Sequence, residues 1–167
     1  MDKKEYTAAV ITVSDKGASG EREDVSGKVM AEMLHSQDFK VLQYVVVPDE
    51  PQLIKDALIC ACNAGADVVL TTGGTGFSSR DNTPEATMAV IEREAMGIAE
   101  AIRYNSFQIT PRAMLSRGVS GIRRKSIIVN LPGSPKAVEE ALGFILDSLK
   151  HGVDILKGAA HDCARKD

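Results

Sequence analysis

The sequence lacks the long apolar runs that a membrane protein needs. No stretch approaches the roughly 18 consecutive apolar residues of a membrane-spanning helix. The apolar run that follows the charged N-terminal residues meets charge again at Asp15, so it is too short for a signal peptide. These absences predict a cytoplasmic protein with no membrane partner.

Basic residues are not concentrated into a long block anywhere in the chain. The formal net charge is −3, and the one dense basic cluster, Arg123-Arg124-Lys125, is short. Proteins that bind nucleic acid carry an extended basic patch or stripe on one face. We therefore interpret the cluster as a solvated turn and expect no nucleic-acid partner.

Cysteine and histidine are scarce, which limits the chemistry that the chain can carry. Three cysteines without the spacing of a disulfide framework are typical of a reducing compartment. Cys60 and Cys62 are expected to be buried small apolar residues rather than zinc ligands, and Cys163 lies near the end of the chain. No histidine has a metal-ligand spacing or a nucleophile beside it (His35, His151, His161). No Ser-His-Asp or Cys-His arrangement is visible, so covalent catalysis has no support.

Short apolar runs rich in β-branched residues are present at residues 8–13, 41–47, 68–71 and 127–131. Their nearly continuous apolar character is typical of strands that are buried on both faces of a parallel sheet. Helical periodicity fills the gaps, including a long apolar stripe from Met88 to Ile102 that predicts one helix. Strands that alternate with helices predict a single domain over residues 1–167. Its fold class is α/β, a three-layer sandwich with a mostly parallel sheet and helices on both faces.

The stretch of residues 113–122 is ambiguous in this scheme. It could be a strand that returns through a turn at residues 123–125 and pairs with the run at 127–131. That pairing would be antiparallel, and it would make the sheet mixed.

Each of the four runs is followed by a loop with chemical content: SDKGASGERED, PDEPQ, TTGGTGFSSRDNTPE and LPGSPK. Ligands of open parallel sheets bind at the carboxyl ends of the strands. The topology therefore predicts that these loops meet at one edge of the sheet. Ser14 and Asp15, which follow the first run, are expected to line the same cleft as the other loops.

Three glycines lie within four positions in the third loop, at Gly73, Gly74 and Gly76. The loop fails the dinucleotide pattern, because Ser79 stands where a glycine is needed, and it fails the P-loop pattern because no lysine follows. Glycine still admits positive φ and removes the Cβ that would block a ligand. Successive amides can then form a nest for an anion, and hydroxyls add to it (Thr71, Thr72, Thr75). We interpret this as a ligand-binding loop rather than a plain turn.

Asp49 and Asp81 each have a structural and a chemical interpretation. Asp49 could be the N-cap of a helix with Gln52 three residues on. Asp81 could be an acid that complements the dipole of the helix that starts after it. Across one crevice, the two carboxylates could instead hold Mg²⁺, which takes one or two carboxylates together with phosphate oxygens of a substrate.

Two helix starts follow the chemical loops. Thr83 before Pro84, and Ser134 before Pro135, are predicted N-caps with proline at the first helical position. The free N–H groups and partial positive charge of such helix starts suit phosphate. For Ser134, an ordinary helix start is an equally good interpretation.

Four segments resemble the MogA/MoaB-like molybdenum-cofactor biosynthesis proteins. They are AVITVSDKG, VVVPDE, TTGGTGFSSRDNTPEAT and MLSRGVSGIRRKSIIVNLPGSPKA, in the same order as in that family. The resemblance covers about residues 8–155. Its central loop is specific because it joins the glycines to Arg80-Asp81 and Thr83-Pro84-Glu85 at fixed spacing. It implies a three-layer α/β sandwich that usually forms a homotrimer.

The family's adenylyltransferase members join molybdopterin to AMP from Mg-ATP, release pyrophosphate and pass the product to molybdenum insertion. The resemblance thus implies molybdopterin and ATP as partners, Mg²⁺ as cofactor, and a downstream molybdenum-insertion protein as a possible further partner. It implies that Asp49 and Asp81 hold Mg²⁺ and serve catalysis, and that residues 73–76 cradle the phosphate end of the pterin. The substrate-binding residues that it implies are Ser14, Asp15, Thr72, Gly73, Gly74, Thr75, Gly76, Arg80, Gly133 and Ser134.

Two alternatives stay open at this point. Arg80 could stabilise the transferred phosphate, or it could simply pair with Asp81. The chain could also be a non-catalytic carrier of molybdopterin or a trimeric scaffold of the same fold. Some MoaB-type members replace the Arg-Asp pair and the following threonine. This chain keeps Arg80, Asp81 and Thr83, which favours the adenylyltransferase branch.

Overall fold

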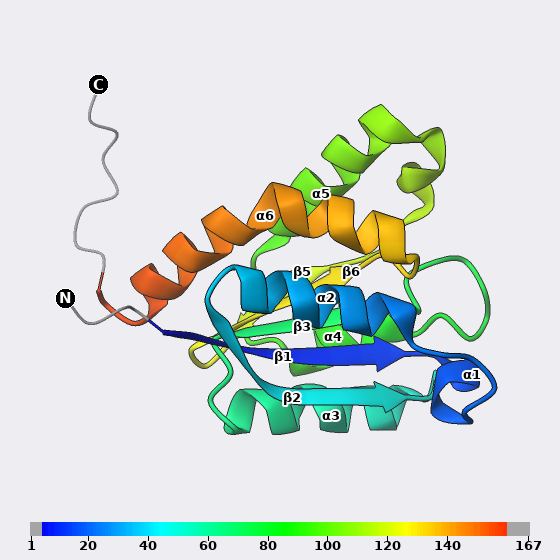
Figure 1. The fold of residues 1–167 in the computed structure, drawn as a ribbon, viewed down its shortest axis with the longest axis horizontal. Helices are drawn as coiled ribbons and strands as arrows, with labels where there is room; N and C mark the ends of the chain where they lie inside the picture. Colours follow the sequence, from blue (N-terminus) through cyan, green and yellow to red (C-terminus); the bar gives the residue numbers. More distant parts are fainter. Residues whose placement is uncertain (1–4, 160–167) are drawn as a thin grey trace.

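Four adjacent parallel strands form most of the sheet, and each contains one of the predicted apolar runs. In the computed structural model, which describes residues 5–159, they are β1 (Tyr6–Val13), β2 (Phe39–Val47), β3 (Val68–Thr72) and β6 (Ser126–Leu131) (Figure 1). β1 pairs with β2 on one side and β3 on the other, and β3 pairs with β6. The carboxyl ends of all four strands therefore lie at one edge of the sheet.

Two antiparallel strands complete the sheet on one side. β5 (Ser120–Arg123) leads through a turn, in which Arg124 has a φ of +53°, into β6, and β4 (Arg93–Glu94) pairs with β5. The strand order is β2-β1-β3-β6-β5-β4. The predicted mixed sheet is confirmed, but only the end of the stretch 113–122 is a strand. Residues Pro111–Leu115 form the short 3₁₀ helix η1 instead.

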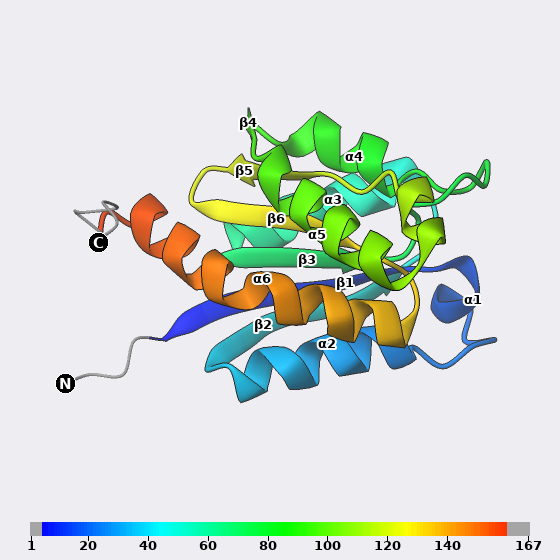
Figure 2. The same ribbon diagram turned by 90° about the horizontal axis from the view of Figure 1, so that it is seen from above.

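Helices cover both faces of the sheet, as Figure 2 shows. They are α1 (Asp15–Ala18), α2 (Val25–Ser36), α3 (Pro51–Asn63), α4 (Thr83–Val90), α5 (Met96–Ile109) and α6 (Pro135–Leu156). Successive side chains of a strand point to opposite faces, so Val10 packs with α2, α5 and α6, whereas Ile11 packs with α3 and α4. Two apolar cores thus flank one sheet, and the predicted three-layer α/β sandwich is confirmed.

The apolar stripe from Met88 to Ile102 is not one helix, so that prediction was wrong. α4 ends at Val90, and the chain then becomes extended, with Glu92 N donating to Ile122 O at 2.8 Å and Ala95 N to Ser120 O at 3.0 Å. The side chain of Ile91 packs directly on Gly121 of β5, where a Cβ would lie 2.6 Å from Ile91 Cδ1. Pairing with β5 therefore replaces the helical hydrogen bonds that the periodicity predicts.

The prediction for the cysteines is half right. Both cysteines belong to α3; Cys62 is buried in the core, but Cys60 is exposed. Residues two apart in a helix point about 200° away from each other, so one face of α3 cannot bury both. Cys163 and His161 lie outside the described residues. Between residues 5 and 159, no helix has the length and apolar character to cross a membrane.

Candidate active site

The four loops that follow β1, β2, β3 and β6 meet at one edge of the sheet, as predicted (Figure 1). Ser14 N donates to Val47 O at 2.9 Å, which joins the ends of β1 and β2. Thr72 Oγ1 donates to Pro132 O at 2.6 Å, which joins the ends of β3 and β6. The hydroxyl of Thr72, predicted to bind substrate, is therefore already committed to the scaffold.

The glycine loop after β3 is folded tightly against its neighbours. Gly73 and Gly74 have φ values of +92° and +69°, which favour glycine. A Cβ on Gly73 would lie 2.3 Å from the carbonyl oxygen of Val13, and one on Gly74 would lie 2.2 Å from Thr83 Oγ1. Both positions thus need glycine for space as well as for conformation, so the backbone itself forms this part of the site.

Thr83 closes the glycine loop rather than capping the helix. Its hydroxyl donates to Gly73 O at 3.0 Å, and its N–H donates to Gly74 O at 3.1 Å. The N-cap of α4 is Asn82, which makes no side-chain cap hydrogen bond. The predicted cap was therefore wrong by one residue, because the hydroxyl of Thr83 is hydrogen-bonded to the glycine loop. Ser134 does cap α6, accepting from Ala137 N at 3.2 Å.

Arg117 braces the glycine loop from the other side, a role that sequence reasoning missed. Its Nε donates to Gly76 O at 2.8 Å and its Nη2 donates to Asp81 O at 2.7 Å. Its backbone N–H donates to Thr75 O at 2.8 Å, and its guanidinium also pairs with Glu85. Because the brace joins residues 41 positions apart in the chain, no local pattern could have predicted it.

Asp15 and Asp49 lock the loops after β1 and β2 together. Asp15 N donates to Asp49 Oδ2 and Asp49 N donates to Asp15 Oδ1, each at 2.9 Å. The N-cap of α3 is Glu50, without a side-chain cap bond. The alternative in which Asp49 caps this helix is therefore excluded, since its carboxylate points to the neighbouring loop instead.

Arg80 does not pair with Asp81, one of the two partners that the sequence suggested. Its Nε and Nη2 donate to the two carboxylate oxygens of Asp15 at 3.0 and 2.9 Å, and its Nη1 donates to Glu50 Oε1 at 2.9 Å. The alternative of a pair with Asp81 is thus wrong. In this conformation the two carboxylates offset the positive charge of Arg80, and three of its N–H groups are occupied.

The pKa values of Asp15 and Asp49 at this edge shift in opposite directions. Hydrogen bonds from Arg80, followed by the bond from the backbone of Asp49, hold the pKa of Asp15 below its ordinary value. Burial raises the pKa of Asp49, and the negative charges of Asp15 and Asp81 add to this effect. Asp49 is therefore a partly buried carboxylate whose ionised form would gain from a nearby cation.

Asp49 and Asp81 flank the glycine loop in an arrangement that fits Mg²⁺. A Cβ on Gly74 would lie 3.3 Å from Asp49 Oδ1, and one on Gly76 would lie 2.9 Å from Asp81 Oδ2. The Oδ2 of Asp81 accepts from Ser78 N at 2.9 Å, and within residues 5–159 the Oδ1 of neither carboxylate accepts a hydrogen bond. No group of three or more acidic, histidine or cysteine side chains in the described chain could hold a metal alone. Two carboxylates with free oxygens suit Mg²⁺ that is completed by substrate phosphate and water.

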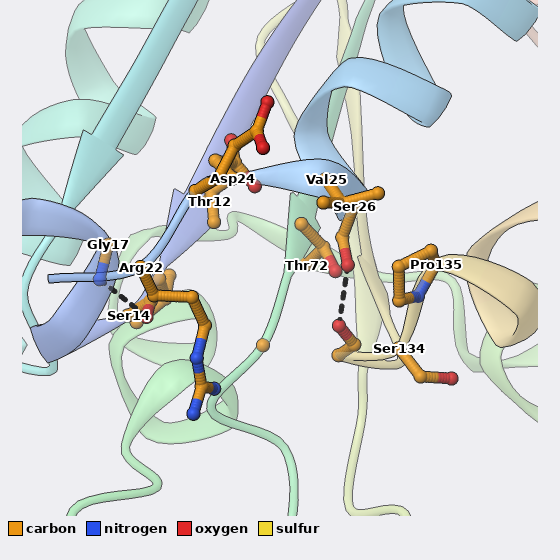
Figure 3. Close-up of a pocket in the computed structure, with 14 residues that line it drawn as sticks. Thr12, Ser14, Gly17, Arg22, Asp24, Val25, Ser26, Thr72, Ser134 and Pro135 are labelled. Atoms are coloured by element: carbon orange, nitrogen blue, oxygen red, sulfur yellow. Dashed lines mark hydrogen bonds between the residues drawn. The ribbon is translucent and has the colours of Figure 1, made fainter. Parts of the chain in front are cut away.

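Beside the carboxylates lies a pocket of about 590 Å³ (Figure 3). Among its lining residues, five were predicted as substrate-binding: Ser14, Thr72, Gly73, Gly133 and Ser134. Three others that sequence reasoning missed also line it, namely Arg22, Asp24 and Ser26. The remaining predicted residues do not line this pocket and lie on the glycine loop or the acidic side: Asp15, Asp49, Gly74, Thr75, Gly76, Arg80 and Asp81. The site therefore has two neighbouring parts that share Gly73.

Many polar side chains of the pocket serve the scaffold. Ser14 caps α1 by accepting from Gly17 N at 3.0 Å, and Ser26 Oγ donates to Gly133 O at 2.7 Å. Asp24 caps α2, accepting from Gly27 N at 2.9 Å. The first turns of α2 and α6 both border the pocket, and the partial positive charge of helix starts favours an anion.

Known proteins are similar to this chain in sequence and in fold. The family model described as "Probable molybdopterin binding domain" matches residues 9–151. A protein named molybdopterin adenylyltransferase from Helicobacter pylori is 41% identical over 152 residues, covering 89% of this chain and 86% of the relative. The solved molybdopterin biosynthesis enzyme MoaB of Thermus thermophilus has a TM-score of 0.85 and 45% identity, covering 92% of this chain and 97% of its own. The tungsten cofactor synthesizing protein MoaB of Pyrococcus furiosus has a TM-score of 0.83 and 39% identity, covering 95% and 99%. The chain therefore belongs to the MogA/MoaB-like family of molybdenum-cofactor biosynthesis proteins.

Proposed function

We propose that this protein is a molybdopterin adenylyltransferase, which transfers AMP from Mg-ATP to the phosphate of molybdopterin. The observation that carries the proposal is the pair Asp49 and Asp81, which flank a glycine loop beside a pocket of about 590 Å³. That volume lies within the roughly 300–1,000 Å³ typical of small-molecule sites. Relatives that bear the name molybdopterin adenylyltransferase support the same conclusion.

The reaction needs positioning and charge stabilisation rather than a covalent nucleophile. An oxygen of the molybdopterin phosphate attacks the α-phosphorus of ATP in line and forms a new P–O bond. The bond from the α-phosphorus to the oxygen that bridges to the β-phosphorus breaks, and pyrophosphate leaves with that electron pair. Mg²⁺, when bound, neutralises negative charge that builds up on these phosphates.

The residues of this chain have separate tasks in such a transfer. The free oxygens of Asp49 and Asp81 would hold the metal, and Arg117 would keep Asp81 and the glycine loop in place through the carbonyls of Gly76 and Asp81. The first turns of α2 and α6 would receive anionic groups of the substrate in the pocket. A carrier of molybdopterin needs only the groups that bind it, whereas an enzyme also needs carboxylates that hold the metal for the transfer.

The test is direct incubation of the purified protein with molybdopterin, Mg²⁺ and ATP labelled at the α-phosphate. We expect the label in a pterin product and an equal amount of pyrophosphate. ATP labelled at the γ-phosphate is the control, and its label should appear only in pyrophosphate. Molybdopterin that binds without any labelled product would contradict the proposal and favour the carrier.

We also propose that the protein assembles as a homotrimer in the cytoplasm. Large apolar side chains are exposed along α5 and η1: Tyr104, Phe107, Ile109, Met114 and Leu115. Apolar surface of this kind favours contact with another protein surface. Sedimentation equilibrium at micromolar concentration should give the mass of three chains, and a single species with the mass of one chain would refute the trimer.

A further inference from the structure

Three charged side chains line the pocket beside the carboxylates, and two of them are held by partners within the chain. Glu23 pairs with Lys28, with Oε1 and Nζ 2.5 Å apart. Asp24 accepts hydrogen bonds from Gly27 N and Thr12 Oγ1, and another from the hydroxyl of Tyr44. The ion pair offsets the charge of Glu23, whereas Asp24 keeps its negative charge but has its carboxylate oxygens bound within the scaffold.

The third charged side chain, Arg22, is not neutralised. Its backbone N–H donates to Lys16 O at 3.1 Å, which fixes the loop between α1 and α2. Within residues 5–159 its guanidinium has no hydrogen bond and no ion pair. Arg22 lines the pocket, and Figure 3 shows its side chain beside Ser14, across the pocket from Ser134. Arg22 therefore presents five N–H donors and a full positive charge to whatever occupies the pocket.

Arg80 does not fill this role, although the sequence made it the expected cation. It donates three hydrogen bonds to Asp15 and Glu50, and it does not line the pocket. The hydroxyls around Arg22 are also committed, since Ser14 caps α1 and Ser134 caps α6. An anion in the pocket would thus find one uncommitted charged side chain.

We propose that Arg22 is a phosphate-binding, specificity-determining residue, which holds a phosphate group of a substrate in this pocket. The inference rests on the proposed adenylyl transfer, in which molybdopterin and ATP both carry phosphate. The planar guanidinium binds two phosphate oxygens at once, and such charge-assisted pairs are the strong hydrogen bonds of proteins. The first turns of α2 and α6 face the same space and add partial positive charge. Phosphate is the group that both features favour.

The test compares Arg22→Gln and Arg22→Lys with the unaltered protein, and Arg112→Gln is the matched control. Arg112 lies on η1, does not line the pocket, and loses the same charge when replaced. Adenylylation is measured with molybdopterin varied at saturating Mg-ATP, and with ATP varied at saturating molybdopterin. We expect Arg22→Gln to raise one of the two KM values about tenfold, as the loss of a charge-assisted contact predicts, with kcat nearly unchanged.

The KM that rises identifies the phosphate. A rise for molybdopterin assigns Arg22 to the pterin phosphate, and a rise for ATP assigns it to the nucleotide. Arg22→Lys should recover part of the loss, because it keeps the charge but not the planar fork. If both KM values match those of Arg112→Gln, Arg22 holds no phosphate and the proposal is overturned.

Equilibrium titration with molybdopterin and with Mg-ATP separately distinguishes this proposal from the proposed function. An unaltered protein that binds a ligand but forms no product contradicts the adenylyltransferase. In that case a Kd about tenfold weaker in Arg22→Gln still supports the role of Arg22, and an unchanged Kd overturns it. Binding of neither ligand by the unaltered protein overturns both.

Discussion

Replacing Arg117 with glutamine should separate loop positioning from folding stability. The guanidinium makes two hydrogen bonds to carbonyls, to Gly76 O and Asp81 O, and hydrogen bonds of charged groups contribute about 1.5–3 kcal/mol each. The side chain is 35% exposed, so water replaces part of what is lost. The pair with Glu85 adds at most about 1 kcal/mol because Glu85 is exposed. We expect Arg117→Gln to lose about 2 kcal/mol, or roughly 4–8 °C in Tm.

The effect of the same substitution on catalysis should be larger than its effect on binding. Without the brace, the chain between Gly76 and Asp81 has more conformations, and the carboxylate of Asp81 is held less often where the transfer needs it. Misplacement by about 1 Å can cost roughly a hundredfold in rate. We expect kcat for adenylylation to fall at least about tenfold, whereas the Kd for molybdopterin changes less than about threefold.

The assays are thermal unfolding, steady-state adenylylation and titration with molybdopterin, all on one set of variants. Glu85→Gln is the control, because it removes the exposed ion pair and leaves both carbonyl contacts of Arg117. It should lose less than about 1 kcal/mol and keep its rate. Arg117→Lys should recover part of the rate because it can still donate to one carbonyl. A normal kcat in an Arg117→Gln protein that has lost stability would refute the positioning role.

Two further substitutions test the loops around the carboxylates. Because burial and the neighbouring carboxylates raise the pKa of Asp49, its ionised form costs the folded state stability at neutral pH. Asp49→Asn should therefore raise Tm at neutral pH without Mg²⁺, abolish transfer, and lose its Tm advantage as the pH falls below the ordinary aspartate range. Gly73→Ala should lower the free energy of unfolding by roughly 1–3 kcal/mol, because the new Cβ would meet Val13 O. The control is Gly143→Ala, which places its Cβ in open space on α6 and should raise the free energy of unfolding by up to about 1 kcal/mol. Equal Tm values for the two glycine variants would contradict the packing of the loop.

The parts of this fold that depend on local sequence could be predicted. The apolar runs predicted β1, β3 and β6, which are buried along most of their length as nearly continuous apolar strands should be. They also predicted β2, although this edge strand is only partly buried. Parallel pairing then brought their ends to one edge, which is why loops far apart in the sequence were correctly grouped. The cap at Ser134 was also predicted, since capping is decided within one turn of helix.

The parts that depend on distant partners could not be predicted in the same way. The helix expected from Met88 to Ile102 is broken by pairing with β5, and tertiary hydrogen bonds overrode the local periodicity. Thr83 was expected to cap α4 and Arg80 to pair with Asp81 or a phosphate, but Thr83 bonds the glycine loop and Arg80 bonds Asp15 instead of Asp81. Arg117 is the clearest case, because its role depends on carbonyls of another loop, and carbonyls carry no sequence signal.

In the proposed reaction, the carboxylates at the glycine loop serve transfer, while the backbone and the pocket serve binding. Asp81→Asn tests it most directly, because an amide oxygen can still accept from Ser78 N and the loop should keep its shape. The measurement is single-turnover adenylylation beside titration with molybdopterin on this one variant. We expect a rate at least about a hundredfold lower with pterin affinity within about threefold, as when an interaction made mainly in the transition state is lost. If Asp81 only complements the dipole of α4, the variant will lose at most roughly 1 kcal/mol of stability and keep a near-normal rate, and that result would refute a role of Asp81 in transfer.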